Sequence, residues 1–330
     1  MRRRMVGIGL LLALMVLALL CSCENSVTPP AAGKMHIFVY GNDYLYGNRF
    51  YYEDGTLAGY GYPLRGTVND ALQTGLSLCA LAQKAGYEYD GTFMLGMEPK
   101  EVSDPNVTVI NNVFLDPFLL ELDALGARIS DGDISIFFFS GHGLGEETML
   151  EYGSDASERS YFAFRQIREA SGAKDLTSSI LYPDYKILSR IETLPGTKVV
   201  LGDFCFSGAF VRPGNVSVTP DEYSGIDATR LFFGYRDDIK ESSSLFCLTA
   251  ARYYEKSWEP GGGAHGYFTA ALLKALGWDE KNQTVATPAA MVDNRITLFG
   301  LVNYVAGNDD KAAQTPMTNG GSNDIILFSL

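Results

Sequence analysis

The chain has 330 residues, with 26 lysines and arginines against 39 aspartates and glutamates, and a formal net charge of −13 at pH 7. A chain this acidic is poorly suited to binding nucleic acid, whose phosphates attract basic proteins, and is better suited to attracting cationic peptides. The length is sufficient for one large α/β domain with insertions.

The first 22 residues are typical of a secretory signal peptide. Three arginines, Arg2 to Arg4, precede an apolar stretch over 6–20 that is too short for a comfortable membrane span. The stretch ends in Leu-Cys-Ser-Cys, which resembles a bacterial lipoprotein cleavage site. We therefore expect removal of residues 1–22, lipidation of Cys23 and a tether over 23–34, which would place the exported chain on a membrane of the bacterial cell envelope. Cys21 is the alternative lipid site, and an ordinary signal peptide or an uncleaved anchor is the alternative to lipidation.

Hydrophobic periodicity and turn residues predict the elements of the remaining chain. Up to residue 191 they are, in order, a strand over 35–40, a Tyr- and Gly-rich insertion over 41–66, a helix over 68–84, a strand over 87–95, a loop over 96–111, a helix over 113–125, a strand over 134–139, a loop over 143–183 and a helix over 185–191. Beyond it they are a strand over 199–201, a connection over 209–242, a strand over 244–250, helices over 266–276 and 292–305, and a strand over 325–328 that would close the sheet. This alternation predicts one α/β domain over 35–330, with three layers and a mostly parallel six-stranded sheet flanked by helices.

Two of the apolar strands each present one reactive side chain where they end. The first is followed by Ser140-Gly-His142-Gly143, and the second by Asp203-Phe-Cys205-Phe-Ser-Gly. Active sites of open α/β sheets form at the carboxyl ends of the strands. A thiol and an imidazole at such an edge predict a cysteine nucleophile with a histidine as its proton carrier.

These motifs resemble those of the caspase/metacaspase group of cysteine peptidases. The cysteine motif matches the metacaspase form and not the Gln-Ala-Cys form of animal caspases. The segment 64–71, Leu-Arg-Gly-Thr-Val-Asn-Asp-Ala, resembles the metacaspase motif after the first strand, and 264–273 resembles the helix after the fifth strand. The resemblance covers roughly residues 35–280 and implies a caspase-like fold. It also implies hydrolysis of peptide bonds through an acyl-enzyme on Cys205, with His142 as proton shuttle.

The resemblance extends to the groups around the reacting atoms. It implies that the backbone amides of Gly143 and Cys205 stabilise the oxyanion. It also implies that Asp70, Ser140 and Asp203 line the specificity pocket. Two carboxylates in a partly closed pocket favour a cationic side chain, and arginine can bridge them with its planar fork. We therefore expect cleavage after Arg or Lys and not after Asp.

Several residues keep a second interpretation. Asp70 is also placed as an acid in the first turn of a helix, where it would complement the helix dipole. Thr67 stands at a position that is often cysteine in the family, so the resemblance does not define that wall of the pocket. His36 begins the first strand and is expected to be structural or on the surface. His265 precedes a helix, where it would cap the helix or contact the site.

The expected partners follow from the same reasoning. They are peptide or protein substrates with basic residues and, through the lipid anchor, a membrane; nucleic acid is not expected, and we expect a monomer. The chemistry requires no cofactor. Many metacaspases need calcium, so calcium stays open, but no acidic cluster has the spacing of an EF-hand and no metal site is predicted.

Two alternatives to this function remain. A peptidase of the legumain, clostripain or gingipain groups would share the fold and the histidine–cysteine pair but cleave at other residues. A catalytically idle caspase-like lipoprotein that binds envelope components or peptides would belong to another functional class. The joint presence of Cys205, His142 and Asp203 favours an active enzyme.

Overall fold

The computed structural model describes residues 33–44, 48–145, 160–170, 173–210, 244–252, 255–261, 264–309, 314–318 and 325–330. The expected signal peptide, the expected lipidation site Cys23 and nearly all of the expected connection over 209–242 lie outside these residues, so those expectations stay predictions. Within the described residues, no helix is long and apolar enough to cross a membrane.

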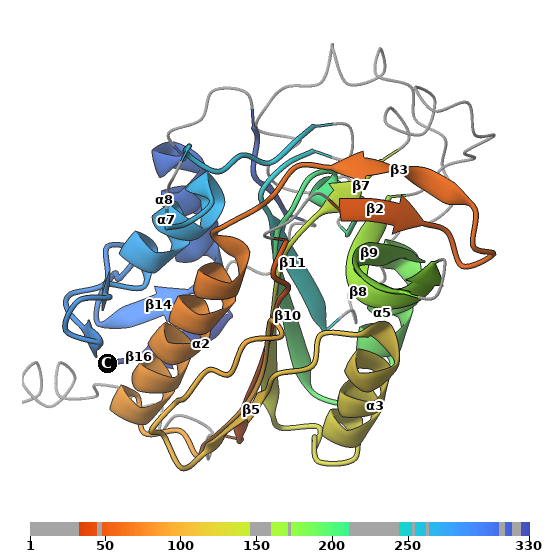
Figure 1. The fold of residues 1–330 in the computed structure, drawn as a ribbon. Coiled ribbons are helices and arrows are strands. Elements are labelled where there is room, and N and C mark those ends of the chain that lie inside the picture. The colour runs from red at the N-terminus through yellow and green to blue at the C-terminus, as the bar shows by residue number, and fades with distance from the viewer. Residues whose placement is uncertain are drawn as a thin grey trace, which may run out of the picture. The chain divides into compact units, whose positions relative to one another are not determined.

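A seven-stranded sheet forms the centre of the fold (Figure 1). Its strands, from one edge to the other, are β15 (Met317–Thr318), β11 (Leu245–Thr249), β10 (Thr197–Asp203), β6 (Ile134–Ser140), β1 (Met35–Gly41), β4 (Tyr89–Leu95) and β5 (Val107–Ile110). All neighbouring pairs are parallel except β11 with β15. The expected α/β fold with a mostly parallel sheet is confirmed.

The expected number of six strands is wrong. Both edge strands, β5 and β15, have only four and two residues, too few for a hydrophobic period to mark them. The last segment does not close the sheet as expected: β16 (Ile326–Ser329) pairs with β14 (Arg295–Thr297) in a separate two-stranded sheet. A further small sheet joins β12 (Trp278–Asp279) to β13 (Thr284–Val285).

Helices cover both faces of the sheet (Figure 1). One face carries α2 (Thr67–Lys84), α7 (Tyr267–Ala275) and α8 (Leu298–Asn308), and the other carries α3 (Leu115–Gly126) and α5 (Asp184–Glu192). Four of the expected helices are confirmed. The fifth begins later than expected, at Leu298, because the side chain of Thr297 caps it by accepting a hydrogen bond from the Gly300 amide at 3.0 Å.

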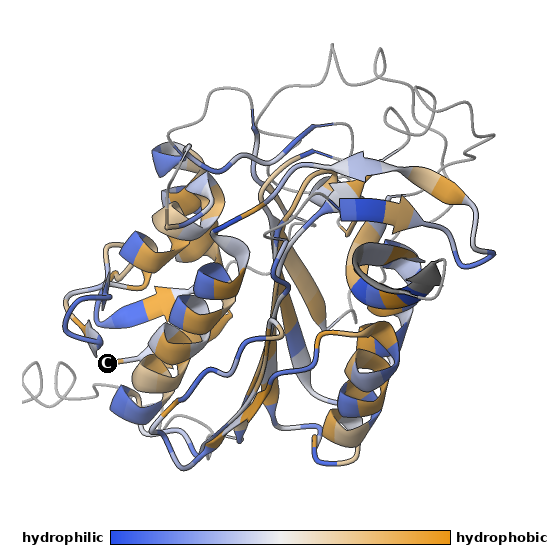
Figure 2. Cartoon of the chain, in the orientation of Figure 1, coloured by the Kyte–Doolittle hydropathy of each residue, from blue (hydrophilic) through white to orange (hydrophobic). Residues whose placement is uncertain are grey.

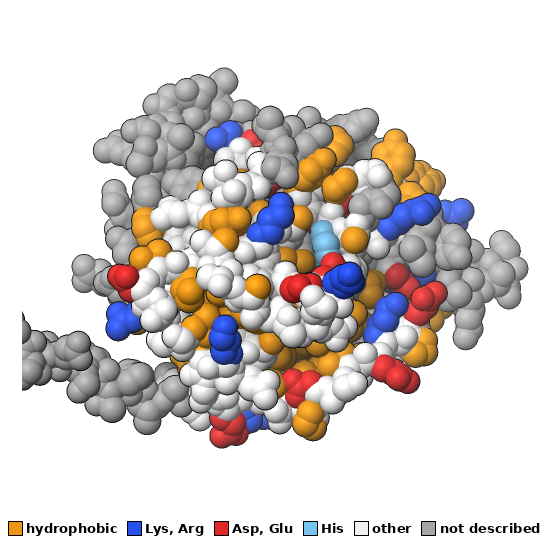
Figure 3. Space-filling view, turned by 90° about the vertical axis from the view of Figure 1, so that its left-hand side faces the viewer, with side chains coloured by type: hydrophobic (Ala, Val, Ile, Leu, Met, Phe, Trp, Pro, Cys, Tyr) orange, Lys and Arg blue, Asp and Glu red, His pale blue; other side chains and the backbone are white. Residues whose placement is uncertain are grey.

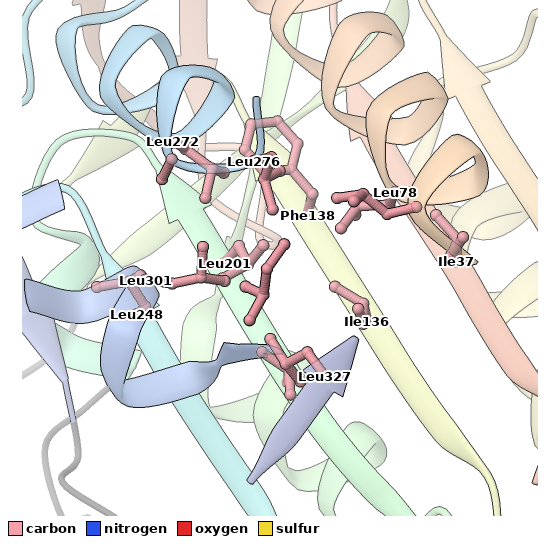
Figure 4. Close-up of a cluster of buried hydrophobic side chains, with 14 of the residues drawn as sticks. Ile37, Leu78, Ile136, Phe138, Leu201, Leu248, Leu272, Leu276, Leu301 and Leu327 are labelled. Carbon is pink, nitrogen blue, oxygen red and sulfur yellow. The ribbon is translucent and has the colours of Figure 1, made fainter. Parts of the chain in front are cut away.

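The central strands are buried on both faces because each contributes side chains to two cores. In β6, Ile136 and Phe138 pack into the core beneath α2, α7 and α8, whereas Phe137 and Phe139 pack into the core beneath α3 and α5. Figure 2 shows these strands as mostly hydrophobic and the helices as mixed, and Figure 4 shows part of the first core. This alternation is the two-residue period of a β-strand.

A second sheet lies beside the carboxyl ends of the central strands (Figure 1). Its order is β3 (Leu57–Gly61), β2 (Asn48–Tyr51), β9 (Ala173–Pro183), β8 (Tyr161–Ala170) and β7 (Gly143–Leu144). The expected loop over 143–183 is therefore wrong for its described residues, because its charged residues hid the alternation of β8. The expected insertion over 41–66 supplies β2 and β3. The sheet joins both segments next to His142, which directly precedes β7.

We expect the first core to dominate stability. Phe138→Ala removes a fully buried ring and should lower the free energy of unfolding by about 3 to 5 kcal/mol. Leu120→Ala is the control, because Leu120 is 68% exposed and should change stability by less than about 0.5 kcal/mol. Urea denaturation followed by circular dichroism measures both, and equal midpoints for the two variants would contradict this account of the core.

Candidate active site

His142 is held by aromatic rings and by a backbone carbonyl. The rings of Tyr44 and Phe50 lie edge-on to the imidazole, with centroids at 4.6 and 5.2 Å. Nε2 donates a hydrogen bond to the carbonyl oxygen of Tyr62 at 2.7 Å. Burial lowers the pKa of His142 to about 4, although the bond to Tyr62 acts in the opposite direction. At neutral pH the ring is therefore neutral, with its proton on Nε2 and a lone pair on Nδ1.

Cys205 lies in a tight turn that follows β10. The turn is fixed by Phe206, which has a left-handed backbone (φ 62°) and donates its amide to the Glu255 carbonyl at 2.7 Å. Sγ of Cys205 donates to the carbonyl oxygen of Ser257 at 3.4 Å. Burial raises the pKa of the thiol to about 11, against smaller lowering contributions from the Ser257 backbone and the Lys256 ammonium. The thiol is protonated at rest.

The two reactive groups line the same pocket, whose volume is about 340 Å³. Within the described residues, no hydrogen bond joins the thiol to the imidazole. The loops that carry them nevertheless touch, because a Cβ built on Gly143 would overlap the backbone carbonyl of Cys205. Gly143 therefore permits the closest approach of the two loops. The role of the Gly143 and Cys205 amides as oxyanion donors stays a prediction.

Asp70 is buried against the same pocket, 2% exposed, in the first turn of α2. Its carboxylate accepts hydrogen bonds from Ser140 Oγ at 2.9 Å, from His265 Nδ1 at 2.8 Å and from the Gly266 amide at 3.3 Å. Burial raises its pKa to about 7, although the bond to His265 works against burial. The carboxylate lies both in the first helical turn and in the pocket wall, and its role in specificity stays a prediction.

Asp203 forms the second buried carboxylate of the pocket, 5% exposed, at the end of β10. Ser257 Oγ donates to it at 2.7 Å, and Thr269 donates both its amide at 3.1 Å and its hydroxyl at 2.6 Å. Burial raises its pKa, and these hydrogen bonds limit the rise. Ser257 thus contacts Cys205 through its carbonyl and Asp203 through its side chain.

Part of this site was not predicted from the sequence. Glu259 lines the pocket and accepts the amides of Arg65 and Gly66, each at 3.1 Å, so it caps the start of α2 with a charge from a distant loop. Tyr62 and Ser257 act through backbone carbonyls, which no side-chain motif reveals. One sequence signal was available for Ser257 and Glu259. They belong to the polar segment after β11, which leaves the sheet at the same edge as Cys205.

His265 contacts the site, which was one of the two roles expected for it. Its Nε2 bonds to Glu280 at 3.0 Å while Nδ1 bonds to Asp70. Burial alone would lower the pKa of His265, but the two carboxylates outweigh burial and raise it. Figure 3 shows a histidine side chain at the surface with acidic and basic side chains beside it. His36 is instead fully buried between Asp90 and Asp133, where it is structural.

No group of three or more metal-ligating side chains with the geometry of a metal site occurs among the described residues. Thr67 forms the part of the pocket wall that the resemblance did not define. It is buried there and donates its hydroxyl to the carbonyl of Asn42. Five of the six expected site residues line this pocket, and Gly143 is not among its lining residues. The five are His142, Cys205, Asp70, Ser140 and Asp203.

No protein-family model and no curated protein matches the chain. Among solved structures it is similar to protein GSU0716 from Geobacter sulfurreducens, with a TM-score of 0.47 and 14% identity over 88% of this chain and 95% of that one. It is also similar to caspase-1 from Spodoptera frugiperda, with a TM-score of 0.45 and 10% identity over 89% of each chain. Because both TM-scores are below 0.5, the proposals that follow depend on the geometry of the site.

The raised pKa of Cys205 predicts how the thiol reacts with iodoacetamide. Only the thiolate is alkylated, so below its pKa the rate should rise about tenfold per pH unit and still be rising at about pH 9.5. An ordinary thiol, with a pKa near 8.5, would level off by then. Mass spectrometry of the modified peptide gives the rate, and Cys205→Ala corrects for alkylation of the other four cysteines. A plateau near pH 9 would contradict a buried, protonated thiol.

Proposed function

We propose that the protein is a cysteine endopeptidase that hydrolyses peptide bonds after basic residues. The observation that carries this proposal is the convergence of a thiol, a neutral imidazole and two buried carboxylates on one pocket of about 340 Å³. The thiol and imidazole supply the chemistry, and the carboxylates supply the recognition.

The reaction begins with attack of Cys205 Sγ on the carbonyl carbon of the bond to be cleaved. The thiol proton passes to Nδ1 of His142, because Nε2 is already bonded to the Tyr62 carbonyl. The negative charge that forms on the substrate oxygen is stabilised by the amides of Gly143 and Cys205. The C–N bond then breaks, and the proton on Nδ1 goes to the leaving amine. Water attacks the thioester, passes a proton through Nδ1, and releases the acid and the thiol.

The resting pKa values have a consequence for this step. Because the pKa of the thiol is about 11 and that of the imidazole is about 4, a thiolate–imidazolium pair is not populated before substrate binds. Proton transfer therefore accompanies the attack. The thiol also has to exchange its hydrogen bond with the Ser257 carbonyl for one with His142, which the bound substrate is expected to bring about.

The pocket favours a cationic side chain next to the cleaved bond. Asp203 and Asp70 are buried, where charge interactions are less screened than on the surface. Glu259 adds a third acid to the lining. A guanidinium or ammonium group relieves the cost of keeping these acids charged, and arginine can contact more than one of them.

The cellular setting belongs to the proposal but rests on the sequence alone. We propose that the enzyme is exported to the bacterial envelope and held there by lipid on Cys23, acting as a monomer. A requirement for calcium is an open question, so activity should be measured both with calcium and with a chelator.

Turnover is the first test of the proposal. The full chain should release fluorophore from peptides that end in Arg or Lys, but not from matched peptides ending in Asp or Asn. Cys205→Ala and His142→Ala should reduce the rate by at least about a thousandfold. Turnover after Asp or Asn alone would keep the mechanism and overturn the pocket assignment. No turnover and no selective labelling of Cys205 would favour the idle binding protein.

A second test addresses the charge of the pocket. Asp203→Asn keeps the shape of the side chain but removes its charge, so kcat/KM for an Arg peptide should fall about 30- to 1000-fold. The rate of Cys205 alkylation by iodoacetamide, which has no cationic group, should change far less. Asp116→Asn is the control, because Asp116 is an exposed acid on α3. Equal losses in peptide turnover and alkylation would show that Asp203 acts on the nucleophile and not on the substrate.

A further inference from the structure

The two buried acids of the pocket differ in the groups that bond to them. Within the described residues, Asp203 accepts hydrogen bonds from two hydroxyls and one backbone amide, all of them neutral. Asp70 also accepts from a hydroxyl and a backbone amide, but in addition it accepts from His265 Nδ1 at 2.8 Å. An imidazole can carry a positive charge. Asp70 is therefore the acid for which the protein itself can supply a counter-ion.

The contacts of His265 require a proton on both ring nitrogens. Nδ1 faces the carboxylate of Asp70, and Nε2 faces that of Glu280 at 3.0 Å. An ionised carboxylate only accepts hydrogen bonds, and an imidazole donates from both nitrogens only when it is an imidazolium. The side-chain amide of Asn69 lies 3.3 Å from Nε2, but it donates to Glu280 at 3.1 Å, so the shorter carboxylate contacts decide the protonation. Burial lowers the pKa of His265, but the two carboxylates outweigh burial and raise it.

His265 contacts Asp70 without lining the pocket. Asp70 is one of the lining residues, whereas His265 is not. The side chain of Asp70 is 3% exposed and that of His265 is 12% exposed. A cation in the pocket would therefore meet the carboxylate of Asp70 and lie farther from the imidazolium behind it. At such a separation the attraction to the nearer carboxylate exceeds the repulsion from the imidazolium.

The other charged groups around this pair do not replace His265. Burial and the like charge of Asp203 raise the pKa of Asp70 to about 7, whereas the bond and the charge of His265 lower it. Glu259 adds a further negative charge to the lining and raises the pKa of Asp203. Lys256 also lines the pocket, but the ion pair of Asp70 is with His265.

We propose that His265 is a positioning residue for substrate recognition: its imidazolium, held by Glu280, keeps Asp70 ionised, so that the pocket presents two charged acids to a cationic side chain. The inference rests on the proposed function and adds the group that sets the charge of its pocket. Without His265, Asp70 would take up a proton at neutral pH. The pocket would then lose one of its charged acids while keeping its shape.

Benzamidine, a small amidinium cation, tests this proposal without turnover. The full chain carrying Cys205→Ala is titrated with benzamidine by calorimetry from about pH 5.5 to about pH 9.5, and the affinity should fall as the pH drops through the pKa of Asp70, about 7. His265→Gln keeps a hydrogen-bond donor but has no charge. It should move the midpoint of this fall upward by about one pH unit, so that affinity at about pH 7 is three- to tenfold lower and recovers at about pH 9.5.

Two further variants separate charge from structure. Glu280→Gln removes the charge that favours the imidazolium, so it should move the midpoint in the same direction by a smaller amount. Its side chain is 42% exposed, so this variant carries the test if His265→Gln does not fold. Glu192→Gln is the control, because Glu192 is an exposed acid at the end of α5, on the other face of the sheet, and should leave the midpoint unchanged.

The outcomes distinguish this inference from the proposed function. An unchanged midpoint in His265→Gln and Glu280→Gln, or an equal loss of affinity at every pH, would overturn the role of His265. Absence of benzamidine binding at any pH would overturn it as well. The expected shift of the midpoint, in a chain whose native form does not cleave peptides, would support the role of His265 and contradict the peptidase function.

Discussion

The site depends on the parallel, in-register pairing of β6 with β10. In this pairing Ser140 lies opposite Asp203, so both strands end at the same level, and the Gly141 amide donates to the Asp203 carbonyl at 3.4 Å just beyond the last pair. His142 and Cys205 each follow two residues later. A shift of one residue in either strand would turn Ser140 or Asp203 to the opposite face of the sheet, away from Asp70 on α2. The hydrophobic alternation that fills the two cores therefore also sets the geometry of the candidate site.

The buried carboxylates show how the fold tolerates charge at this edge. Asp70 and Asp203 are almost fully buried, and an unpaired charge there would be costly. Each carboxylate is instead surrounded by donors from α7 or its preceding residues, such as Thr269 and Gly266, with Ser140 and Ser257 adding hydroxyls. These donors hold the acids in place, so little reorganisation would be needed for the cationic side chain of the proposed substrate to bind. The raised pKa of both acids is the remaining cost of burial.

The sequence was sufficient for the elements that carry a strong period and for the residues in motifs. The apolar runs of β6 and β10 were predicted because both faces of each strand are buried, and the position of His142 and Cys205 at their ends follows from the parallel order. The second sheet was not predicted, because β8 interrupts its apolar residues with Arg165, and because β9 pairs with β2, which is far from it in the chain. The backbone carbonyl that accepts the hydrogen bond from His142 could not be predicted either, because any residue at position 62 would supply the same carbonyl.

The thiol and the imidazole of the candidate site are both uncharged at neutral pH. Burial raises the pKa of the thiol and lowers that of the imidazole, so both groups are neutral at rest, and the Cys205 thiol donates a hydrogen bond to a backbone carbonyl. In a thiolate-based site the charge is present beforehand, and reactivity toward small electrophiles is high. Under the proposed mechanism the charge would instead form during the attack, where only a correctly placed carbonyl carbon and its oxyanion donors would stabilise it. If the protein is the proposed peptidase, its selectivity would then come from binding, because the acidic pocket would position the bond before the attack begins.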